Sequence, residues 1–321
     1  MLTKSDAISK LNELGSAQLP FSFYCNFLGE SWCIEQNSSA QLRGSFHLKV
    51  GTPYSEFRIQ NVEFRKAPLS FESFKRAFDQ VIHEINVGNS FLTNLTFKTP
   101  IETNLSLDQI FEYSQAKYKL LVPGQFVVFS PETFVKIEDD HIYSYPMKGT
   151  IDGSLHNAEE IILGDIKERA EHVTIVDLIR NDLSQVANQV EVTKFRYVDE
   201  LMTNDKKLLQ ISSEVRGHLS RDWKSNIGTI LSKLIPAGSI SGAPKPETLR
   251  IIQQVERYDR NFYTGICGHF DGESLETGVM IRFIKKEENQ LFYCSGGGIT
   301  SFSEAEKEYQ EMVDKVYLPI S

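Results

Sequence analysis

Apolar side chains recur three and four positions apart in several segments, which is the spacing of one helix face. The clearest segment places Phe74, Phe78 and Val81 on one face and stops at Gly88, a residue type that often follows a helix. The second half of another segment is apolar almost all round, so we expect it to be buried on more than one side. The helices predicted in this way are Phe71–Val87, Asn157–Leu183, Pro244–Tyr258 and Ser303–Leu318.

The last of these predicted helices carries signals at both ends. Ser303 and Glu306 have the spacing of a capping box, in which two side chains satisfy backbone N–H groups at a helix start. Pro319 then ends the segment, because proline cannot continue a helix.

Short aromatic-rich or alternating runs predict strands elsewhere. A turn at Glu138–Asp140 separates two of these runs. The predicted strands are Phe21–Gly29, Gln125–Lys136, His141–Lys148, Leu275–Lys285 and Gln290–Ser295. Strands and helices are mixed without the regular β–α alternation of a doubly wound sheet or barrel. We therefore expect an α+β fold of extended β-sheets packed with helices.

The chain is long enough for one large domain. Its 321 residues can bury a sizeable core without disulfides, and its 40% hydrophobic content is ordinary for a globular protein. It contains no repeat, low-complexity run or long Pro/Gly/Ser linker. We therefore expect a single domain over residues 1–321.

The charge balance narrows the range of partners. Lys and Arg number 34 against 43 Asp and Glu, a net charge of −9. Nucleic acids and anionic membranes bind clustered basic residues, so neither is an expected partner. No stretch resembles a signal peptide or approaches the roughly 18 apolar residues of a membrane span. The four cysteines lack zinc-like pairing, and we expect a cytoplasmic protein with reduced thiols.

One lysine leaves a predicted strand directly before a glycine, at Lys148-Gly149. If its amine reached a partly desolvated cleft, it would lose its proton more readily and could act as a nucleophile or base. A surface lysine at a turn is the commoner outcome for this spacing alone.

Two glutamate pairs share helical spacing. Glu168 and Glu171 are neighbours on one predicted helix, and Glu308 and Glu311 are neighbours on another. Taken singly, each pair is typical of a solvent-exposed helix face. Together, the four carboxylates could surround a hard divalent cation, which prefers carboxylate oxygens; without an ion they would repel one another.

Three successive glycines follow the strand predicted near residue 290. Gly296, Gly297 and Gly298 would let backbone N–H groups approach a ligand closely and form an anion-binding concavity. A flexible turn is the alternative interpretation of the same residues.

Two apparent motifs are rejected. The segment 238–245 resembles a phosphate loop, but Ala243-Pro244 breaks the G-x-x-x-x-G-K-[ST] spacing, so we do not expect nucleotide binding. The segment around Cys267 resembles a glutamine amidotransferase elbow, but His269 stands where G-x-C-x-G requires glycine. We therefore expect Cys267 to be a small packed residue.

Nine segments, in order, resemble the chorismate-utilising enzymes: anthranilate synthase component I, aminodeoxychorismate synthase component I, isochorismate synthase and salicylate synthase. Each segment alone is weak, but nine in register are specific. They are GNSFLTNLT (88–96), SPE (130–132), PMKGT (146–150), KERAEHVTIVDLIRNDL (167–183), GSISGAPK (238–245), YTGICGHFDG (263–272), IRF (281–283), SGGGI (295–299) and EKEYQE (306–311). The resemblance implies that family's fold, with a catalytic core at 70–318 after a shortened sheet-forming segment of roughly 70 residues.

The resemblance also implies a magnesium site. Glu171 and Glu311 resemble direct Mg²⁺ ligands, and Glu168 and Glu308 resemble their partners, directly or through water. The ion would hold the ring carboxylate of chorismate and stabilise charge as the C4 hydroxyl leaves.

Further residues are implied to bind the substrate. Arg282 resembles the arginine that grips the pyruvyl carboxylate, a bidentate task suited to a guanidinium, with help from the amides of Gly296, Gly297 and Gly298. Ser241 stands where family members often carry Thr, and is expected to contact the substrate through its hydroxyl.

Lys148 discriminates within the family. Aminodeoxychorismate synthases typically carry Lys here, whereas anthranilate, isochorismate and salicylate synthases typically carry Ala. The implied mechanism has the Lys148 amine attack ring C2 of chorismate while the C4 hydroxyl departs; ammonia then adds at C4 and expels the lysine. Glu132 resembles the general acid that protonates the leaving hydroxyl, which requires a raised pKa.

The resemblance leaves alternatives open. Leu209 replaces a family His tied to pyruvate elimination, which favours amination without elimination over anthranilate formation. Anthranilate or isochorismate remains the alternative product, and a catalytically silent chorismate-binding subunit is the third interpretation. We find no glutaminase segment and no tryptophan-binding segment, so we expect ammonia from a glutamine amidotransferase subunit and no tryptophan control.

Overall fold

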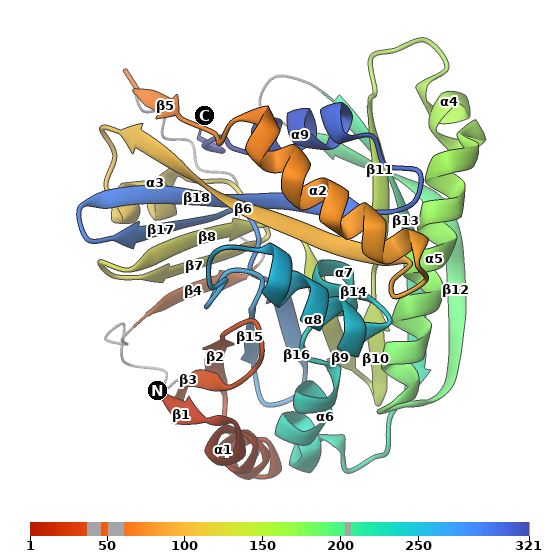
Figure 1. The fold of residues 1–321 in the computed structure, drawn as a ribbon. Helices are drawn as coiled ribbons and strands as arrows, with labels where there is room; N and C mark the ends of the chain where they lie inside the picture. The colour runs from red at the N-terminus through yellow and green to blue at the C-terminus, as the bar shows by residue number, and fades with distance from the viewer. Residues whose placement is uncertain (37–45, 51–60, 203–206, 321) are drawn as a thin grey trace.

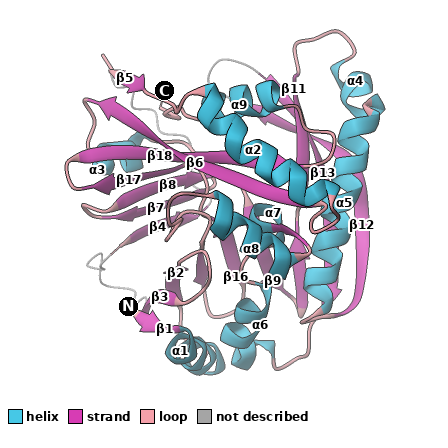
Figure 2. Ribbon diagram, viewed as in Figure 1, coloured by secondary structure: helices cyan, strands magenta, loops and turns pink. Residues whose placement is uncertain are grey.

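A computed structural model describes residues 1–36, 46–50, 61–202 and 207–320, and its strands form two antiparallel sheets (Figure 1). Among the described residues, the first sheet has ten strands and the second has eight. The family-like α+β fold predicted from the sequence is confirmed by this arrangement of large sheets and mixed helices (Figure 2).

The strands of the first sheet run in the order β1 (Leu2–Thr3), β3 (Ser31–Gln36), β2 (Phe21–Cys25), β15 (Ile266–Phe270), β16 (Leu275–Val279), β9 (Thr133–Glu138), β10 (His141–Ser144), β13 (Lys207–His218) and β11 (Met147–Asp152), with β12 (Asn188–Met202) paired to β13. The second sheet runs β14 (Gly242–Ala243), β6 (Leu92–Thr103), β18 (Gln290–Ile299), β17 (Phe283–Glu287), β8 (Phe126–Ser130), β7 (Tyr118–Val122) and β4 (His47–Val50), with β5 (Phe64–Lys66) paired to β6.

Helices pack against both sheets. They are α1 (Lys4–Ser16), α2 (Phe71–Asn86), α3 (Leu107–Tyr113), α4 (Ala158–Gly164), α5 (Ile166–Ser184), α6 (Ile227–Leu234), α7 (Gly238–Ser241), α8 (Lys245–Val255) and α9 (Ala305–Asp314), with a 3₁₀ turn at Trp223–Asn226. In Figure 1, α2, α8 and α9 lie on the second sheet, while α1 and α6 pack beside each other at the end of the first. None of the helices in the described part of the chain is both long and apolar enough to span a membrane.

The inner faces of the two sheets meet in an apolar cluster. Tyr24 and Cys267 come from the first sheet, and Val128, Phe126 and Phe283 come from the second; all five are buried in this cluster. Burial of such apolar area supplies the main favourable free energy of the fold, about 25 cal/mol per Å². The cluster holds the two sheets together close to the cavity described below.

Three predicted strands are each broken in the structure. The chain passes from the second sheet to the first at Pro131–Glu132, between β8 and β9, and returns at 280–282, between β16 and β17. The third break, at Tyr145-Pro146, separates β10 from β11. Proline has no N–H for a ladder, which accounts for two of the breaks. Alternation of apolar residues cannot reveal which sheet a strand joins, so the crossings were missed.

The predicted helix over 157–183 is also two helices. Asp165 has an extended backbone with φ −67° and ψ 113° between α4 and α5, and its side chain accepts a hydrogen bond from the N–H of Glu168. Asp165 therefore caps a new helix. The exposed face of α5 carries Ile166 and Val173, which are 83% and 47% exposed, so the expected burial on several sides holds only for its other faces.

The capping box predicted at Ser303 is wrong. Helix α9 begins at Ala305 with Glu304 as its N-cap and no side-chain capping hydrogen bond. The Ser303 hydroxyl instead donates to Oε1 of Glu308, at 2.7 Å. The Ser303 hydroxyl therefore bonds the Glu308 carboxylate and does not cap the helix.

Candidate active site

A cavity of about 650 Å³ opens between the two sheets. This volume lies within the range of roughly 300–1,000 Å³ that is usual for small-molecule sites. Its lining includes most of the residues predicted from the sequence: Glu132, Lys148, Glu168, Glu171, Arg282, Gly296, Gly297, Gly298 and Glu311. The fold therefore brings together side chains that are up to 179 positions apart in the chain, between Glu132 and Glu311.

A predicted site residue lies at each of the two places where the chain crosses from one sheet to the other. Glu132 lies between β8 and β9, and its carbonyl accepts the N–H of Val279 at 3.0 Å. Arg282 lies between β16 and β17, where its carbonyl accepts the N–H of Phe129 at 3.1 Å. Arg282 also has a φ of 53°, which is uncommon for a residue with a side chain and is typical of functional positions held by their surroundings.

Glu132 has the properties expected of an acid. The Ser239 hydroxyl donates to its Oε1 at 2.7 Å. Burial raises the pKa of the Glu132 carboxyl, while the Ser239 hydrogen bond and the positive charges of Arg282 and Lys315 oppose the rise without cancelling it. A carboxyl with a raised pKa keeps its proton at higher pH, as a proton donor must.

Lys148 lies inside the cavity and is not a solvent-exposed turn residue. Its side chain is 26% exposed, and Nζ lies 2.7 Å from Oε2 of Glu171, whose side chain is only 5% exposed. Burial lowers the pKa of the Lys148 ammonium, but the carboxylates of Glu171, Glu168 and Glu311 outweigh burial, and the net pKa is raised. The amine is thus charged among these carboxylates, unlike the readily deprotonated amine that desolvation alone would give.

The four glutamates converge on two sides of the cavity. Glu171 accepts a hydrogen bond from the Thr300 hydroxyl at 3.4 Å, and Glu311 forms an ion pair with Lys315 at 2.7 Å. A Cβ atom built on Gly297 would lie 3.5 Å from Oε2 of Glu308 and 4.0 Å from Oε1 of Glu311. Glu308 therefore lies next to the cavity, although it is not part of its lining.

The chemistry of these donors fits a hard cation. Carboxylate oxygens are the ligands that Mg²⁺ prefers. Within the described residues, no three acidic, His or Cys side chains form a group that could hold a metal ion, and Glu171 and Glu311 are each ion-paired with a lysine. A cation entering this place would replace the lysine partners of carboxylates that are already gathered there.

The surroundings of Arg282 favour the binding of an anion. Its guanidinium carbon lies 5.5 Å from the centre of the Tyr317 ring, a cation–π distance. Its Nε is buried and has no hydrogen-bond partner among the described residues. A buried donor of this kind costs free energy until a ligand satisfies it, which favours a carboxylate at this place.

The glycine triplet is part of a strand and not a loop. Gly296, Gly297 and Gly298 lie in β18, opposite Thr96, Leu95 and Asn94 of β6. The pairing of β18 with β17 ends at Cys294, so the other edge of the triplet faces the cavity. A Cβ atom on Gly296 would lie 2.3 Å from the Leu95 carbonyl oxygen, which only glycine avoids.

The structure separates the two serines of α7. Ser241 is fully buried, and its hydroxyl donates to the Ala237 carbonyl at 2.8 Å, so the predicted substrate contact through Ser241 has no support here. Ser239 lines the cavity instead. Residues two apart on a helical turn point to opposite sides, and the sequence pattern alone could not tell which side faced the site.

Lys315 is a second lining residue that sequence reasoning missed. Its Nζ bridges Glu311, at 2.7 Å, and the carbonyl oxygen of Gly296, at 2.9 Å. The available signal was the i, i+4 spacing from Glu311, which is also typical of ordinary surface pairs. Its position against the glycine strand depends on tertiary contacts.

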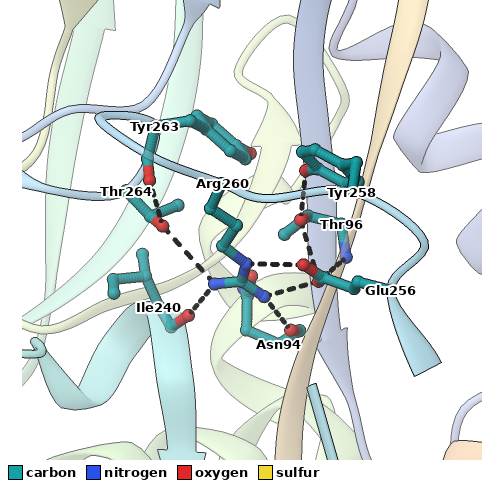
Figure 3. Close-up of polar contacts among 8 residues, drawn as sticks. All are labelled: Asn94, Thr96, Ile240, Glu256, Tyr258, Arg260, Tyr263 and Thr264. Atoms are coloured by element: carbon teal, nitrogen blue, oxygen red, sulfur yellow. Dashed lines mark hydrogen bonds and ion pairs between the residues drawn. The ribbon is translucent and has the colours of Figure 1, made fainter. Parts of the chain in front are cut away.

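A buried arginine ties three walls of the cavity together (Figure 3). Arg260 donates to the carbonyls of Ile240, at 2.8 Å, and Asn94, at 2.6 Å, and to the Thr264 hydroxyl at 3.4 Å. It also forms two hydrogen bonds with Glu256, at 2.8 and 2.6 Å. All five N–H groups of the guanidinium are therefore used.

Cys267 and Leu209 are two residues that we do not expect to take part in the reaction. Cys267 is fully buried, and burial raises the pKa of its thiol to about 12, which agrees with a packed residue and not a nucleophile. Leu209, which stands at the place of the family His, is buried in β13 opposite Ile151.

Comparisons with known proteins show which family the chain resembles. The model of a family described as chorismate binding enzyme matches residues 14–321. An uncharacterised PabA-like protein of Pasteurella multocida is 48% identical over 317 residues, 98% of each chain. Anthranilate synthase component 1 of Arthrobacter globiformis is 36% identical over 200 residues, 60% of this chain and 36% of that protein.

More distant relatives give the same result. Aminodeoxychorismate synthase component 1 of Bacillus subtilis is 31% identical over 266 residues, 78% of this chain and 55% of that protein. The crystal structure of a 2,3-dihydroxybenzoate-specific isochorismate synthase from Bacillus anthracis superimposes with a TM-score of 0.70 at 21% identity, over 97% of this chain and 88% of that one. The chain belongs to the chorismate binding enzyme family.

Proposed function

We propose that this protein is an aminodeoxychorismate synthase component I, which aminates chorismate at C4 to give 4-amino-4-deoxychorismate. The relatives' names include several chorismate activities, so they do not choose among products. The observation that carries the proposal is the primary amine of Lys148 inside the cavity, 2.7 Å from Glu171 and in the same lining as Glu132 and Arg282.

The proposed reaction has two substitutions. Lys148 first gives a proton to solvent, and its amine then forms a bond to ring C2 while both ring double bonds shift (C1=C2 to C1=C6 and C5=C6 to C4=C5) and the C4–O bond breaks. Glu132 gives its proton to the departing hydroxyl, which leaves as water. Ammonia next bonds to C4, both double bonds shift back, and the C2–N bond to Lys148 breaks; the new C4 ammonium gives a proton to Glu132, and the released lysine takes up a proton from solvent. The net change replaces one hydroxyl with one amino group, and Lys148 and Glu132 return to their starting states after proton transfer.

Binding groups hold chorismate during both steps. Arg282, with its buried and unsatisfied Nε, would take the pyruvyl carboxylate, beside the glycine strand. Glu171 and Glu311, supported by Glu168 and Glu308, would hold Mg²⁺. When bound, the ion would supply positive charge for the ring carboxylate and for the hydroxyl as it leaves.

Product analysis tests the proposal. We expect mass spectrometry of chorismate incubated with Mg²⁺, an ammonium salt and the protein to show 4-amino-4-deoxychorismate. Lys148→Ala should lower its formation by at least about a hundredfold, because the attacking group is gone. Lys75→Ala, which removes an exposed lysine paired with Asp79 on α2, is the matched control and should keep the wild-type rate.

The same assay separates the alternatives. Anthranilate or isochorismate as the main wild-type product, or amination at the normal rate by Lys148→Ala, would contradict the proposal. A silent chorismate-binding subunit would consume no chorismate at all. We expect glutamine to replace the ammonium salt only when a glutamine amidotransferase subunit is added, since we propose that this partner supplies the ammonia.

A further inference from the structure

The proton donor of the proposed reaction is held by a hydroxyl from a separate element. Ser239 of α7 donates to Oε1 of Glu132, at 2.7 Å, and both residues line the cavity. We propose that Ser239 is a positioning residue that fixes the Glu132 carboxyl and leaves its Oε2 to carry the transferred proton. This inference rests on the proposed role of Glu132 as the acid.

One end of α7 is anchored to helix α5. The Asp182 side chain accepts the N–H of Gly238 and forms an ion pair with Lys245, at 2.9 Å. A Cβ atom on Gly238 would lie 2.8 Å from Oδ2 of Asp182, so glycine permits this close approach. Asp182 and Lys245 are 8% and 19% exposed in their side chains, and such enclosed pairs move little.

The middle of α7 is anchored to the arginine network of Figure 3. Arg260 donates to the carbonyl of Ile240, the residue that follows Ser239. Arg260 is itself fixed by Glu256, and both side chains are only 2% exposed. The peptide on each side of Ser239 is thus held by a buried charged group, and the backbone position of Ser239 is set independently of Glu132.

Glu132 is fixed from its own side by backbone contacts. Its N–H donates to the Ser130 hydroxyl at 3.1 Å, and its carbonyl accepts from Val279 at 3.0 Å. The remaining freedom of Glu132 lies in its side-chain torsions, and the Ser239 hydrogen bond restricts them. Because Oε1 accepts that hydrogen bond, the acidic proton belongs on Oε2 when Glu132 is protonated.

The same contact affects the proton affinity of Glu132. Among the described residues, the charged groups that act on it are Arg282, between β16 and β17, and Lys315, after α9. With Ser239, these groups lower the pKa that burial raises. Removing the hydroxyl should therefore raise the pKa of Glu132 further, so the protonated form would persist to higher pH.

The test is the pH profile of chorismate consumption by Ser239→Ala. We expect kcat to fall by about 10- to 100-fold with little change in KM, since the acid is no longer oriented. The alkaline limb of the profile should move up by about one pH unit, the size expected for loss of a hydrogen bond to a carboxylate. Ser239→Thr keeps the hydroxyl and should restore both quantities at least in part.

Controls distinguish the possible failures. Ser184→Ala is the control. It removes an exposed hydroxyl that donates to the Arg180 carbonyl within α5, and it should change neither kcat nor the alkaline limb of the pH profile. An unchanged kcat and limb in Ser239→Ala would overturn the inference, as would a raised KM alone, which indicates substrate binding instead. Wild-type activity in Glu132→Gln would contradict the proposed function itself. If Ser239→Ala does not fold, Ser239→Cys, whose thiol is a much weaker donor, takes its place with the same expected and contradicting results.

Discussion

Single side chains in this protein depend on partners that lie far away in sequence. Arg260 and Glu256 are four residues apart, yet the guanidinium also fixes the carbonyls of Asn94 and Ile240 on two other elements. Both side chains are 2% exposed. A buried ion pair adds little net stability relative to apolar residues, but removing one partner leaves an uncompensated charge.

We expect Arg260→Leu to lower the free energy of unfolding by about 3–5 kcal/mol, because the Glu256 carboxylate would remain buried without its counter-charge. Denaturant titration measures the change. Arg180→Lys, which alters an exposed arginine paired with Asp177, is the control and should have no measurable effect. Similar behaviour of the two variants would show that the network of Figure 3 does not contribute as described.

At the scale of elements, helix α5 reverses the usual amphipathic arrangement. Its glutamates Glu168 and Glu171 face the cavity, whereas Ile166 and Val173 are exposed. Hydrophobic spacing alone predicts the opposite orientation. The reversal is confined to the first half of the helix, because Val176, Ile179 and Leu183 lie further along the same face as the glutamates and are 5%, 7% and 1% exposed.

This orientation predicts unequal effects of two substitutions. Ile166→Glu should change the free energy of unfolding by less than about 0.5 kcal/mol, since the residue is 83% exposed at the first turn, where an acidic side chain is tolerated. Leu183→Ala should cost about 2–5 kcal/mol through the cavity it leaves. Thermal or denaturant unfolding compares them, and a large loss in Ile166→Glu would mean that α5 packs differently.

The sequence predicted helices better than their junctions. Helix α2 was predicted to within a residue, because its periodic face and its end signal agree. The break at Asp165 and the sheet crossings at Glu132 and Arg282 were missed, since they depend on which sheet accepts each strand. Pro131 gave a local hint of the first crossing, but the bend before Arg282 contains no proline.

The candidate site was predicted largely through family resemblance. Motif matching placed Lys148 and Glu171 in one site, and the structure pairs them at 2.7 Å. It could not choose between Ser239 and Ser241, nor identify Lys315, because those roles depend on which way a side chain points after folding. The roles of these residues in catalysis and metal binding remain predictions.

At the scale of the whole molecule, the proposed ion would join two helices that are far apart in the chain. Glu171 belongs to α5 and Glu311 to α9, 140 positions apart. A ligand that binds only the folded state stabilises it in proportion to its concentration, by about 2.7 kcal/mol at a hundred times its Kd. Mg²⁺ should therefore raise the Tm of the wild-type protein.

We expect Glu171→Gln and Glu311→Gln each to remove most of the Mg²⁺-dependent rise in Tm and to weaken Mg²⁺ binding measured by calorimetry. The quantity to compare between variants is the increase in Tm on addition of Mg²⁺, because loss of the ion pair with Lys148 or Lys315 also alters the Tm without Mg²⁺. Glu112→Gln, on an exposed glutamate paired with Lys49, should keep the full rise. An equal rise in all variants would contradict the ligand assignment.

The two sheet crossings lie side by side, since β8 pairs with β17 in one sheet and β9 pairs with β16 in the other. Glu132 and Arg282 therefore share the same seam of the molecule. If one sheet slides or tilts against the other, Glu132 and Arg282 should move together. A relative shift of the two sheets should therefore change the spacing between these two groups less than the spacing between residues far from the seam.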